Sequence, residues 1–190
     1  MKTVELPRVP LRNAPIWPMS LAAYHALGEA GLIPKNTELL YGFVYRKMPK
    51  SPAHCYLLQK LLQALATAVP ASCLLRSEQP IACVDSEPEP DLSVVTGSVE
   101  DYRRDHPHTA ELVIEVCLTK VEYDRSKIPA YAGAGVKECW LVLGYARQIE
   151  VYRQPAGDKF AECVTHGPGG KLASSALPEF TLDLDALFNP

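Results

Sequence analysis

Hydrophobic positions recur along the chain with two different spacings, and this alternation predicts its helices and strands. Leucines at 57, 58, 61, 62 and 65 follow a helical period, which predicts an amphipathic helix from Ala53 to about Ala68. Ser20 provides an N-cap for an earlier helix that runs to about Ala30 and ends at Gly31. A further helix is expected at about 125–134.

Short apolar runs between these helices predict strands. A hairpin is expected over 37–48, with its turn near Tyr41-Gly42. Further strands are expected at about 74–84, 91–96, 112–118, 138–144 and 148–153. Residues 155–170 are rich in glycine and proline and predict a loop or a loose hairpin, and the tail from 177 predicts a short strand and helix. A strand-helix-strand crossover between Glu115 and Trp140 indicates an α/β fold with a mixed central β-sheet flanked by helices.

Length and composition favour one globular domain. The chain has 190 residues, of which 47% are hydrophobic and 22% charged. Its proline-rich start predicts an extended N-terminal arm over 1–18, followed by a single domain over 19–190. No apolar run reaches the roughly 18 residues needed to cross a bilayer, and the start lacks the apolar segment of a signal peptide. We therefore expect a cytoplasmic protein with no membrane partner and no organic cofactor.

Charge and cysteine usage exclude some kinds of site. The net charge of -3 gives no global basic footprint, which argues against a module that only binds nucleic acid. The six cysteines contain no Cys-x-x-Cys pair and no zinc-site spacing with histidine, so we interpret them as reduced core residues.

Two carboxylates stand in strand-like apolar runs and require an explanation. Asp91 follows Pro90 at the start of a hydrophobic strand, and Glu115 lies within Leu-Val-Ile-Glu-Val-Cys. An unpaired carboxylate buried in such a strand costs several kcal/mol. Asp124, Lys127 and Tyr131 are spaced i, i+3, i+7, so on one helix they share a face that can look back at the Glu115 strand. Two carboxylates and a lysine would suit a hard divalent cation such as Mg²⁺.

Each of these residues also has a structural interpretation. Asp91 could cap a turn after Pro90, and Glu115 could form a buried ion pair with Lys127 that needs no metal. Tyr131 and Trp140 are interpreted as core aromatic residues. Gln79 is either an exposed strand residue or a polar group lining the site.

The pattern of these residues resembles a known nuclease signature. Pro90-Asp91 followed by Ile114-Glu115-Val116 resembles the motif of the PD-(D/E)XK superfamily. A wider series of segments resembles the Uma-two family of restriction endonucleases within that superfamily. These segments are 79–81, 87–91, 112–116, 123–125, 127–132, 135–140 and 150–153. Where the superfamily has a lysine two residues after the glutamate, this chain has Cys117, and Lys127 matches the lysine that this branch has in the following helix.

The resemblance implies a restriction-endonuclease-like fold and a metal-dependent endonuclease. Asp91 and Glu115 would bind Mg²⁺ (or Mn²⁺), and Lys127 would be the third catalytic residue, in a hydrolysis of DNA by a metal-activated water. Supporting roles are expected for Glu38, His54, Gln79 and Asp124. Glu38 would add a carboxylate or pair with a lysine, His54 would be a site or capping residue, and Asp124 would support the site or interact with the helix dipole.

The partners follow from the same expectation. Cleavage of both strands of a duplex suggests a homodimer, and the basic residues Arg46, Lys47, Lys50, Arg103 and Arg104 are candidates for phosphate contacts. The main alternative is a catalytically inactive nuclease-fold module that binds nucleic acid or another protein. A metal-dependent phosphoesterase with a different substrate is a third class.

Overall fold

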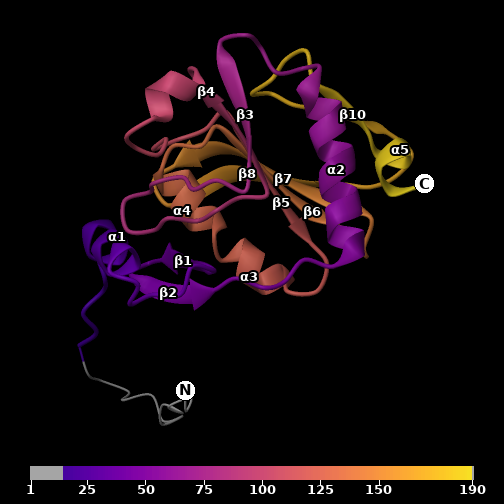
Figure 1. Ribbon diagram of the computed structural model, residues 1–190. Helices are drawn as coiled ribbons and strands as arrows, with labels where there is room; N and C mark the ends of the chain where they lie inside the picture. The colour runs from indigo at the N-terminus through magenta and orange to yellow at the C-terminus, as the bar shows by residue number, and fades with distance from the viewer. Residues whose placement is uncertain (1–14, 190) are drawn as a thin grey trace.

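A six-stranded mixed sheet forms the centre of the molecule (Figure 1). The computed structural model describes residues 15–189. The order across the sheet is β3-β4-β5-β6-β7-β8. These strands are β3 (Cys73–Ser77), β4 (Leu92–Thr96), β5 (Leu112–Cys117), β6 (Glu138–Leu143), β7 (Gln148–Ala156) and β8 (Lys159–His166). Only β5 and β6 pair in parallel, so the predicted α/β fold with a mixed sheet is confirmed.

The parallel pair requires a crossover, which two short helices provide. They are α3 (Val121–Arg125) and α4 (Ile128–Gly133). The sequence predicted a single helix at about 125–134, which corresponds to α4, and α3 was not predicted as a separate helix. Pro129 lies in the first turn of α4 and has no N–H to donate to the Arg125 carbonyl, so the helix breaks there. The hydroxyl of Tyr41 bridges the break, since it donates to the Ser126 carbonyl at 2.5 Å and accepts from the Ala130 N–H at 3.2 Å.

One face of the sheet is covered by α2 (Pro52–Ala66) and the C-terminal segment (Figure 1). The predicted leucine stripe is confirmed, because Leu57, Leu61 and Leu65 are the buried residues of α2. The tail forms the expected strand and helix, β10 (Thr181–Asp183) and α5 (Leu184–Phe188), and β10 pairs with β9 (Lys171–Ala173). Trp140 stacks on Phe180 with ring centroids 5.6 Å apart, so the predicted core position of Trp140 is confirmed.

The opposite face packs against α4. Alternation along β5 sends Leu112, Ile114 and Val116 into the cluster with α2, whereas Val113 packs with Tyr131 of α4. Glu115 has the same parity as Val113 and therefore lies on the α4 face. All six residues of β5 are buried, as expected for a strand covered on both sides.

The N-terminal part forms a separate small layer next to α3 (Figure 1). It consists of α1 (Leu21–Glu29) and the hairpin of β1 (Thr37–Leu40) and β2 (Phe43–Arg46), all three as predicted. Ser20 caps α1 by accepting the Ala23 N–H at 3.2 Å. The hairpin docks on the chain before β4, where the Glu87 N–H donates to the Leu39 carbonyl at 2.6 Å. This contact brings β1 to the edge of the α4 face.

Two predicted strand boundaries are wrong. The strand expected at 74–84 ends at Ser77, because Glu78 adopts a left-handed φ of 56° and Pro80 has no N–H for a ladder. The strand expected at 148–153 extends to Ala156, and of the two alternatives for residues 155–170 the hairpin is present, since β8 pairs with β7 across a turn at Gly157, where φ is 65°.

The core interpretation of the cysteines is correct for only some of them. Cys83, Cys117 and Cys139 are buried, whereas Cys55 and Cys163 are exposed. In the predicted N-terminal arm, residues 1–14 lie outside the described part of the chain, so the division into arm and domain remains a prediction. None of the helices among residues 15–189 has the length and apolar character needed to span a lipid bilayer.

Candidate active site

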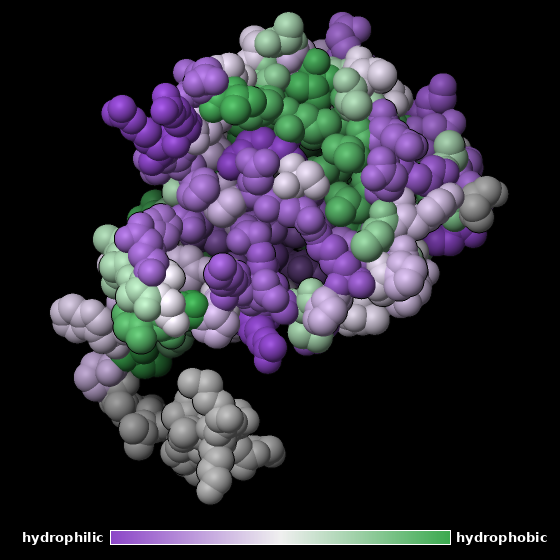
Figure 2. Space-filling model, viewed as in Figure 1, coloured by the Kyte–Doolittle hydropathy of each residue, from purple (hydrophilic) through white to green (hydrophobic). Residues whose placement is uncertain are grey.

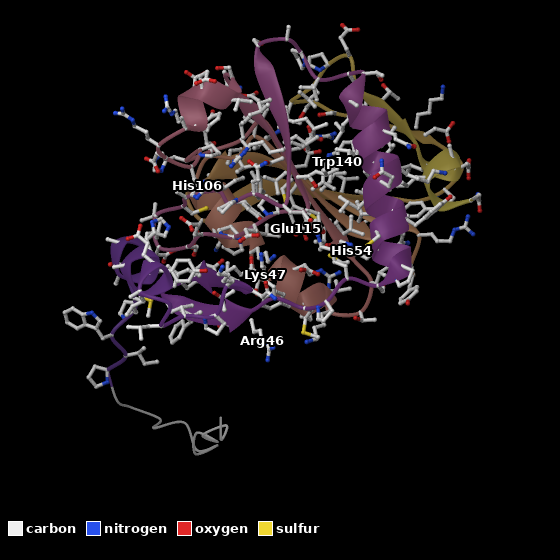
Figure 3. The ribbon with its side chains drawn as sticks, viewed as in Figure 1. Arg46, Lys47, His54, His106, Glu115 and Trp140 are labelled. Carbon is white, nitrogen blue, oxygen red and sulfur yellow. The ribbon has the colours of Figure 1, made fainter. Side chains whose placement is uncertain are left out.

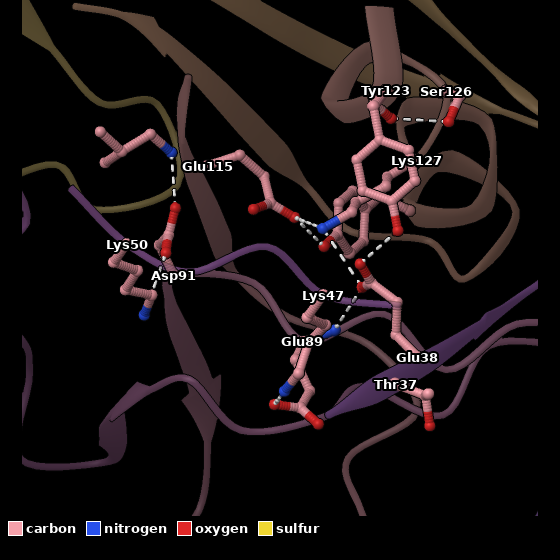
Figure 4. A network of polar contacts seen from close by, with 12 residues as sticks. Thr37, Glu38, Lys47, Lys50, Glu89, Asp91, Glu115, Tyr123, Ser126 and Lys127 are labelled. Carbon is pink, nitrogen blue, oxygen red and sulfur yellow. Dashed lines mark hydrogen bonds and ion pairs between the residues drawn. The ribbon is translucent and has the colours of Figure 1, made fainter. Parts of the chain in front are cut away.

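The pairing of β4 with β5 places Asp91 and Glu115 next to each other. Leu92 pairs with Ile114 in an antiparallel register, so the next position on each strand is Asp91 and Glu115, on the α4 face. Asp91 directly precedes β4, and its Oδ2 accepts the backbone N–H of Val116 at 2.8 Å. Figure 4 shows the Glu115 carboxylate between Asp91 and Lys127. The fold thus brings the three principal candidates together.

Lys127 is buried between two carboxylates. Its Nζ lies 3.2 Å from Oε1 of Glu115 and 3.2 Å from Oε2 of Glu38 (Figure 4), and the side chain is only 5% exposed. The same ammonium lies 5.4 Å from the centroid of the Tyr123 ring. Lys127 occupies the N-cap position of α4, so the break between α3 and α4 determines where its side chain enters the site.

Glu38 holds the lysine from the hairpin side. Besides the pair with Lys127, Oε1 of Glu38 accepts the Tyr123 hydroxyl at 2.6 Å, and Oε2 accepts the Glu89 N–H at 3.2 Å. Of the two interpretations of Glu38, the structure shows the pairing with a lysine. Tyr123 was not a predicted site residue, although its segment belongs to the series that resembles the nuclease family.

Tyr131 was expected on the helix face that looks back at the Glu115 strand, but its contact with Glu115 was not predicted. Its ring is buried in the core as predicted, but its hydroxyl also donates to Oε1 of Glu115 at 2.6 Å. Its N–H donates to the Lys127 carbonyl at 3.1 Å, so both side chains project from one helical turn. The i, i+4 spacing from Lys127 was the signal that could have revealed this role.

His54 and Lys50 approach Asp91 from the chain around the start of α2. His54 lies in the first turn of that helix, as expected, and its Nε2 is 3.1 Å from Oδ2 of Asp91. Its other ring nitrogen, Nδ1, is buried and has no hydrogen-bond partner among residues 15–189. The Lys50 ammonium is 3.6 Å from Oδ1 of Asp91 and also contacts Glu78.

Except for the buried Tyr131, these side chains line one pocket of about 480 Å³. Figure 2 shows a hollow surrounded by hydrophilic residues on this face, and Figure 3 shows Lys47, His54 and Glu115 around the same region. Six acidic residues and four lysines line it, namely Glu38, Glu78, Glu89, Asp91, Glu115, Asp124, Lys47, Lys50, Lys120 and Lys127. The excess of negative charge favours a bound cation.

The remaining candidates lie at or outside this pocket. Asp124 lines it and accepts the Lys127 N–H with its backbone carbonyl at 3.1 Å, but within the described residues it forms no ion pair with Lys127. Gln79 is exposed, lies outside the pocket, and accepts a hydrogen bond from Nε of Arg76 at 2.9 Å. Of the candidates for phosphate contacts, Lys47 and Lys50 line the pocket, whereas Arg103 and Arg104 do not.

The two central carboxylates differ in their electrostatic surroundings. Burial raises the pKa of Glu115 to about 8, although the charge of Lys127 opposes this shift. Burial acts in the same direction on Asp91, but His54, the Val116 N–H and Lys50 together lower its pKa below the ordinary value. Burial alone would lower the pKa of Lys127, but the charges of Glu115 and Glu38 outweigh it and raise that pKa. Lys127 is therefore cationic throughout the neutral range.

The donor set fits a hard cation that keeps much of its hydration. Mg²⁺ is commonly held by one or two carboxylates and completes its shell with water or phosphate oxygens. Asp91 and Glu115 supply two carboxylates at a solvent-accessible pocket, and the described residues contain no cluster of three or more His, Cys, Asp or Glu arranged to hold a metal. This arrangement fits a magnesium ion shared with substrate rather than a closed structural metal site.

Comparisons with known proteins agree with this fold. The model of the family described as "Uma2: Putative restriction endonuclease" matches residues 24–185. Among solved structures, the chain is similar to a putative nuclease belonging to DUF820 from Anabaena variabilis, with a TM-score of 0.71 and 18% sequence identity. The similarity covers 85% of this chain and 96% of that chain, and at this identity it shows the fold alone. None of the curated proteins compared with the chain matches it.

Proposed function

The chain belongs to the Uma2 family of putative restriction endonucleases, and on this premise we propose that it is a Mg²⁺-dependent endonuclease that hydrolyses phosphodiester bonds in DNA. The observation that supports this proposal best is the position of Glu115. Its carboxylate lies beside Asp91, and its Oε1 is 3.2 Å from the buried ammonium of Lys127. A metal-dependent nuclease site needs two carboxylates to bind the metal ion and a positively charged side chain beside the same phosphate.

Asp91 and Glu115 would bind the metal, either Mg²⁺ or Mn²⁺. When bound, such an ion polarises the phosphodiester and lowers the pKa of a coordinated water. Asp91 is oriented by two groups, the Val116 N–H and His54, which both contact Oδ2. Its Oδ1 lies 3.6 Å from the Lys50 ammonium, and a metal bound through this oxygen would share it with Lys50 or displace that ammonium.

Lys127 would act as an electrostatic residue. Because neighbouring carboxylates raise its pKa, it keeps its proton and is unsuited to act as a general base at neutral pH. A fixed ammonium can stabilise the negative charge that develops on the phosphate oxygens during attack, or orient the attacking water. Glu38 and Tyr123 would position it, and Asp124 would border the phosphate-binding region. We propose no role in hydrolysis for Gln79.

A second candidate function is supported by the network itself. The charges of Lys127, Glu115 and Glu38 pair with one another without any metal, as in a structural buried ion pair. An inactive nuclease-fold module that binds nucleic acid or protein would keep this network for stability. It would then bind divalent ions weakly and cleave nothing.

A cleavage assay separates the two functions. The protein is incubated with single-stranded, duplex and branched DNA in Mg²⁺, in Mn²⁺ and in EDTA, beside Glu115→Gln and beside Gln79→Ala as the matched control. Metal-dependent products from the wild type and Gln79→Ala, with none from Glu115→Gln, support the nuclease. The assay also includes a phosphodiester that is not a nucleic acid. Absence of products from wild type on every DNA and on this substrate favours the inactive module, whereas hydrolysis of this substrate alone favours the phosphoesterase class.

We also propose a homodimer for the case of duplex cleavage, since two strand scissions need two active sites or two encounters. Sedimentation of the protein with and without duplex DNA tests this expectation. A monomer in both conditions contradicts it.

A further inference from the structure

The pocket is bordered by three segments that come together from different parts of the chain. They are the stretch 47–51 before α2, residues 118–120 after β5, and Tyr145 in the turn between β6 and β7. The carboxylates and Lys127 line the buried part of the pocket. These three segments, which we call the rim, contribute lysines together with large apolar side chains.

Tyr145 is fixed relative to Glu115 by its turn. The Arg147 N–H donates to the Gly144 carbonyl at 3.3 Å, which closes a turn with Tyr145 at its first central position. The Gly144 N–H donates to the Cys117 carbonyl at 2.9 Å, two residues beyond Glu115. A Cβ on Gly144 would lie 2.4 Å from the Leu118 side chain, so the turn packs closely against the end of β5. These contacts hold the backbone of Tyr145 at a fixed position relative to Glu115, so the side chain starts from a fixed point at the pocket.

The Tyr145 ring is nonetheless exposed. It is 71% accessible, and no hydrogen bond or ring contact of this side chain is found among residues 15–189. Met48 on the opposite segment of the rim is 59% accessible. Lys120, also on the rim, is exposed and forms no ion pair within the described part of the chain. An unpaired aromatic face and a free ammonium thus lie at the entrance to the proposed catalytic residues.

We propose that this rim binds single-stranded or locally unpaired DNA, with one base stacked on Tyr145 and a neighbouring phosphate near Lys120. A base presents its π-face only when it is unstacked, and base-aromatic stacking is how proteins bind single strands without reading sequence. In duplex DNA those faces are covered by neighbouring bases, so Tyr145 would have nothing to stack on. The pocket of about 480 Å³ has the size of a small-ligand site, which suits one extruded nucleotide.

This inference rests on the proposed nuclease function and narrows its substrate. A phosphate directed to Asp91 and Glu115 by a stacked base belongs to one strand only. Cleavage of such a substrate needs one active site per event, so it does not require the homodimer expected for duplex cleavage.

Binding measured without turnover tests the inference. Ca²⁺ replaces Mg²⁺, and the probes are a short single-stranded DNA containing 2-aminopurine and the blunt-ended duplex of that strand with its complement. Wild type should bind the single strand more tightly and quench its fluorescence. Tyr145→Ala should weaken single-strand binding by roughly tenfold and abolish the quenching. Tyr145→Trp should keep the wild-type affinity and the quenching, because it keeps an aromatic ring. Tyr56→Ala, which removes an exposed tyrosine outside the pocket, is the control and should change neither.

Other results overturn the inference. Unchanged single-strand affinity in Tyr145→Ala, an equal loss of duplex affinity, or tighter binding of the duplex by wild type each contradicts it. Melting temperatures of the variants confirm that folding is intact, as expected for an exposed side chain. If Tyr145 is required for binding but no DNA is cleaved in Mg²⁺, the nuclease proposal fails while the stacking surface stands. If cleavage proceeds without any effect of Tyr145, only the substrate inference fails.

Discussion

The ammonium of Lys127 lies 3.2 Å from the carboxylate of Glu115, although Glu115 belongs to β5 and Lys127 to the crossover that follows this strand. The contact depends on the break between α3 and α4, which the Tyr41 hydroxyl bridges. A lysine two residues after the glutamate would instead come from the same strand, where this chain has the buried Cys117. The lysine of the proposed site is therefore supplied by the crossover and not by β5.

Replacing Lys127 should separate catalysis from metal binding. Lys127→Arg keeps a positive charge but cannot occupy the same space between Glu115 and Glu38, so we expect a folded protein that binds Mn²⁺ and cleaves DNA at least tenfold more slowly. Lys127→Met leaves two buried carboxylates without a cation and should lose about 3–5 kcal/mol of stability. Single-turnover cleavage and urea unfolding measure the two effects.

The matched control for the stability part of this prediction is Lys120→Met, because Lys120 lines the same pocket but is exposed and lies outside the Glu115 network. It should leave stability within about 0.5 kcal/mol of wild type. Cleavage by Lys127→Met at the wild-type rate would remove Lys127 from the proposed mechanism.

Metal binding should depend on both carboxylates. Asp91→Asn and Glu115→Gln each remove one anionic ligand while keeping the shape of the side chain, so calorimetric titration with Mn²⁺ should show a loss of binding of tenfold or more. Asp105→Asn, an exposed aspartate outside this pocket, should titrate like wild type. Equal Mn²⁺ affinity in all four proteins would contradict the assignment of the ligands.

The sequence predicted the strands around the site better than the contacts within it. Asp91 and Glu115 stood out because a carboxylate in an apolar run needs a physical reason, and the register of β4 on β5 places them together. The hydrogen bond from Tyr131 to Glu115 was not predicted, since an aromatic residue at a helical spacing is sufficiently explained by the core. The break at Pro129 was missed because the apolar period continues through it.

The rim depends on tertiary packing that no local pattern records. Tyr145 reaches the pocket because its turn packs on the end of β5, a contact between segments separated in sequence by a crossover. Gln79 was expected in the site on a resemblance alone. The left-handed φ at Glu78 ends β3 before the chain reaches Gln79. The Gln79 side chain accepts a hydrogen bond from Arg76 and does not enter the pocket.

The Tyr131 hydroxyl should affect both catalysis and folding. Tyr131→Phe keeps the buried ring and removes only the hydrogen bond to Glu115, which should lower stability by about 1.5–3 kcal/mol where the carboxylate is charged. Because Glu115 then has more freedom, we expect kcat to fall by roughly tenfold with little change in KM. Tyr24→Phe, which removes a tyrosine hydroxyl bonded to Thr37 away from the pocket, is the control. A rise in KM alone, with kcat unchanged, would show that the hydroxyl acts on substrate binding instead.

A second buried carboxylate, Glu138 on β6, anchors the C-terminal segment to the sheet. Its Oε1 accepts from Nε1 of Trp140 at 2.7 Å and from Arg153 at 3.0 Å, and its Oε2 accepts the N–H groups of Ser175 and Ala176 at 2.7 and 2.9 Å. The side chain is fully buried. Burial opposes its ionisation, but the hydrogen bonds from Trp140, Ala176 and the two serines lower its pKa below the ordinary value.

The lowered pKa of Glu138 determines how stability should depend on acid. A carboxylate whose pKa is lower in the folded state stabilises the fold above its unfolded pKa of about 4.3, and this contribution is lost as the pH falls through the folded value. Glu138→Gln should therefore be less stable than wild type by about 1–3 kcal/mol at pH 7, since the amide nitrogen leaves buried donors unpaired. The difference should shrink below about pH 4, where wild type also loses the charge.

Arg153, which faces Glu138 from β7 and also approaches Glu162, stays cationic over this range and does not alter the sign of the expected difference. Urea unfolding at several pH values measures the difference, with Glu111→Gln as control, because Glu111 contacts two exposed residues, Lys137 through an ion pair and Thr96 through a hydrogen bond. Parallel pH profiles for wild type and Glu138→Gln would mean that the charge of Glu138 does not hold the C-terminal segment in place.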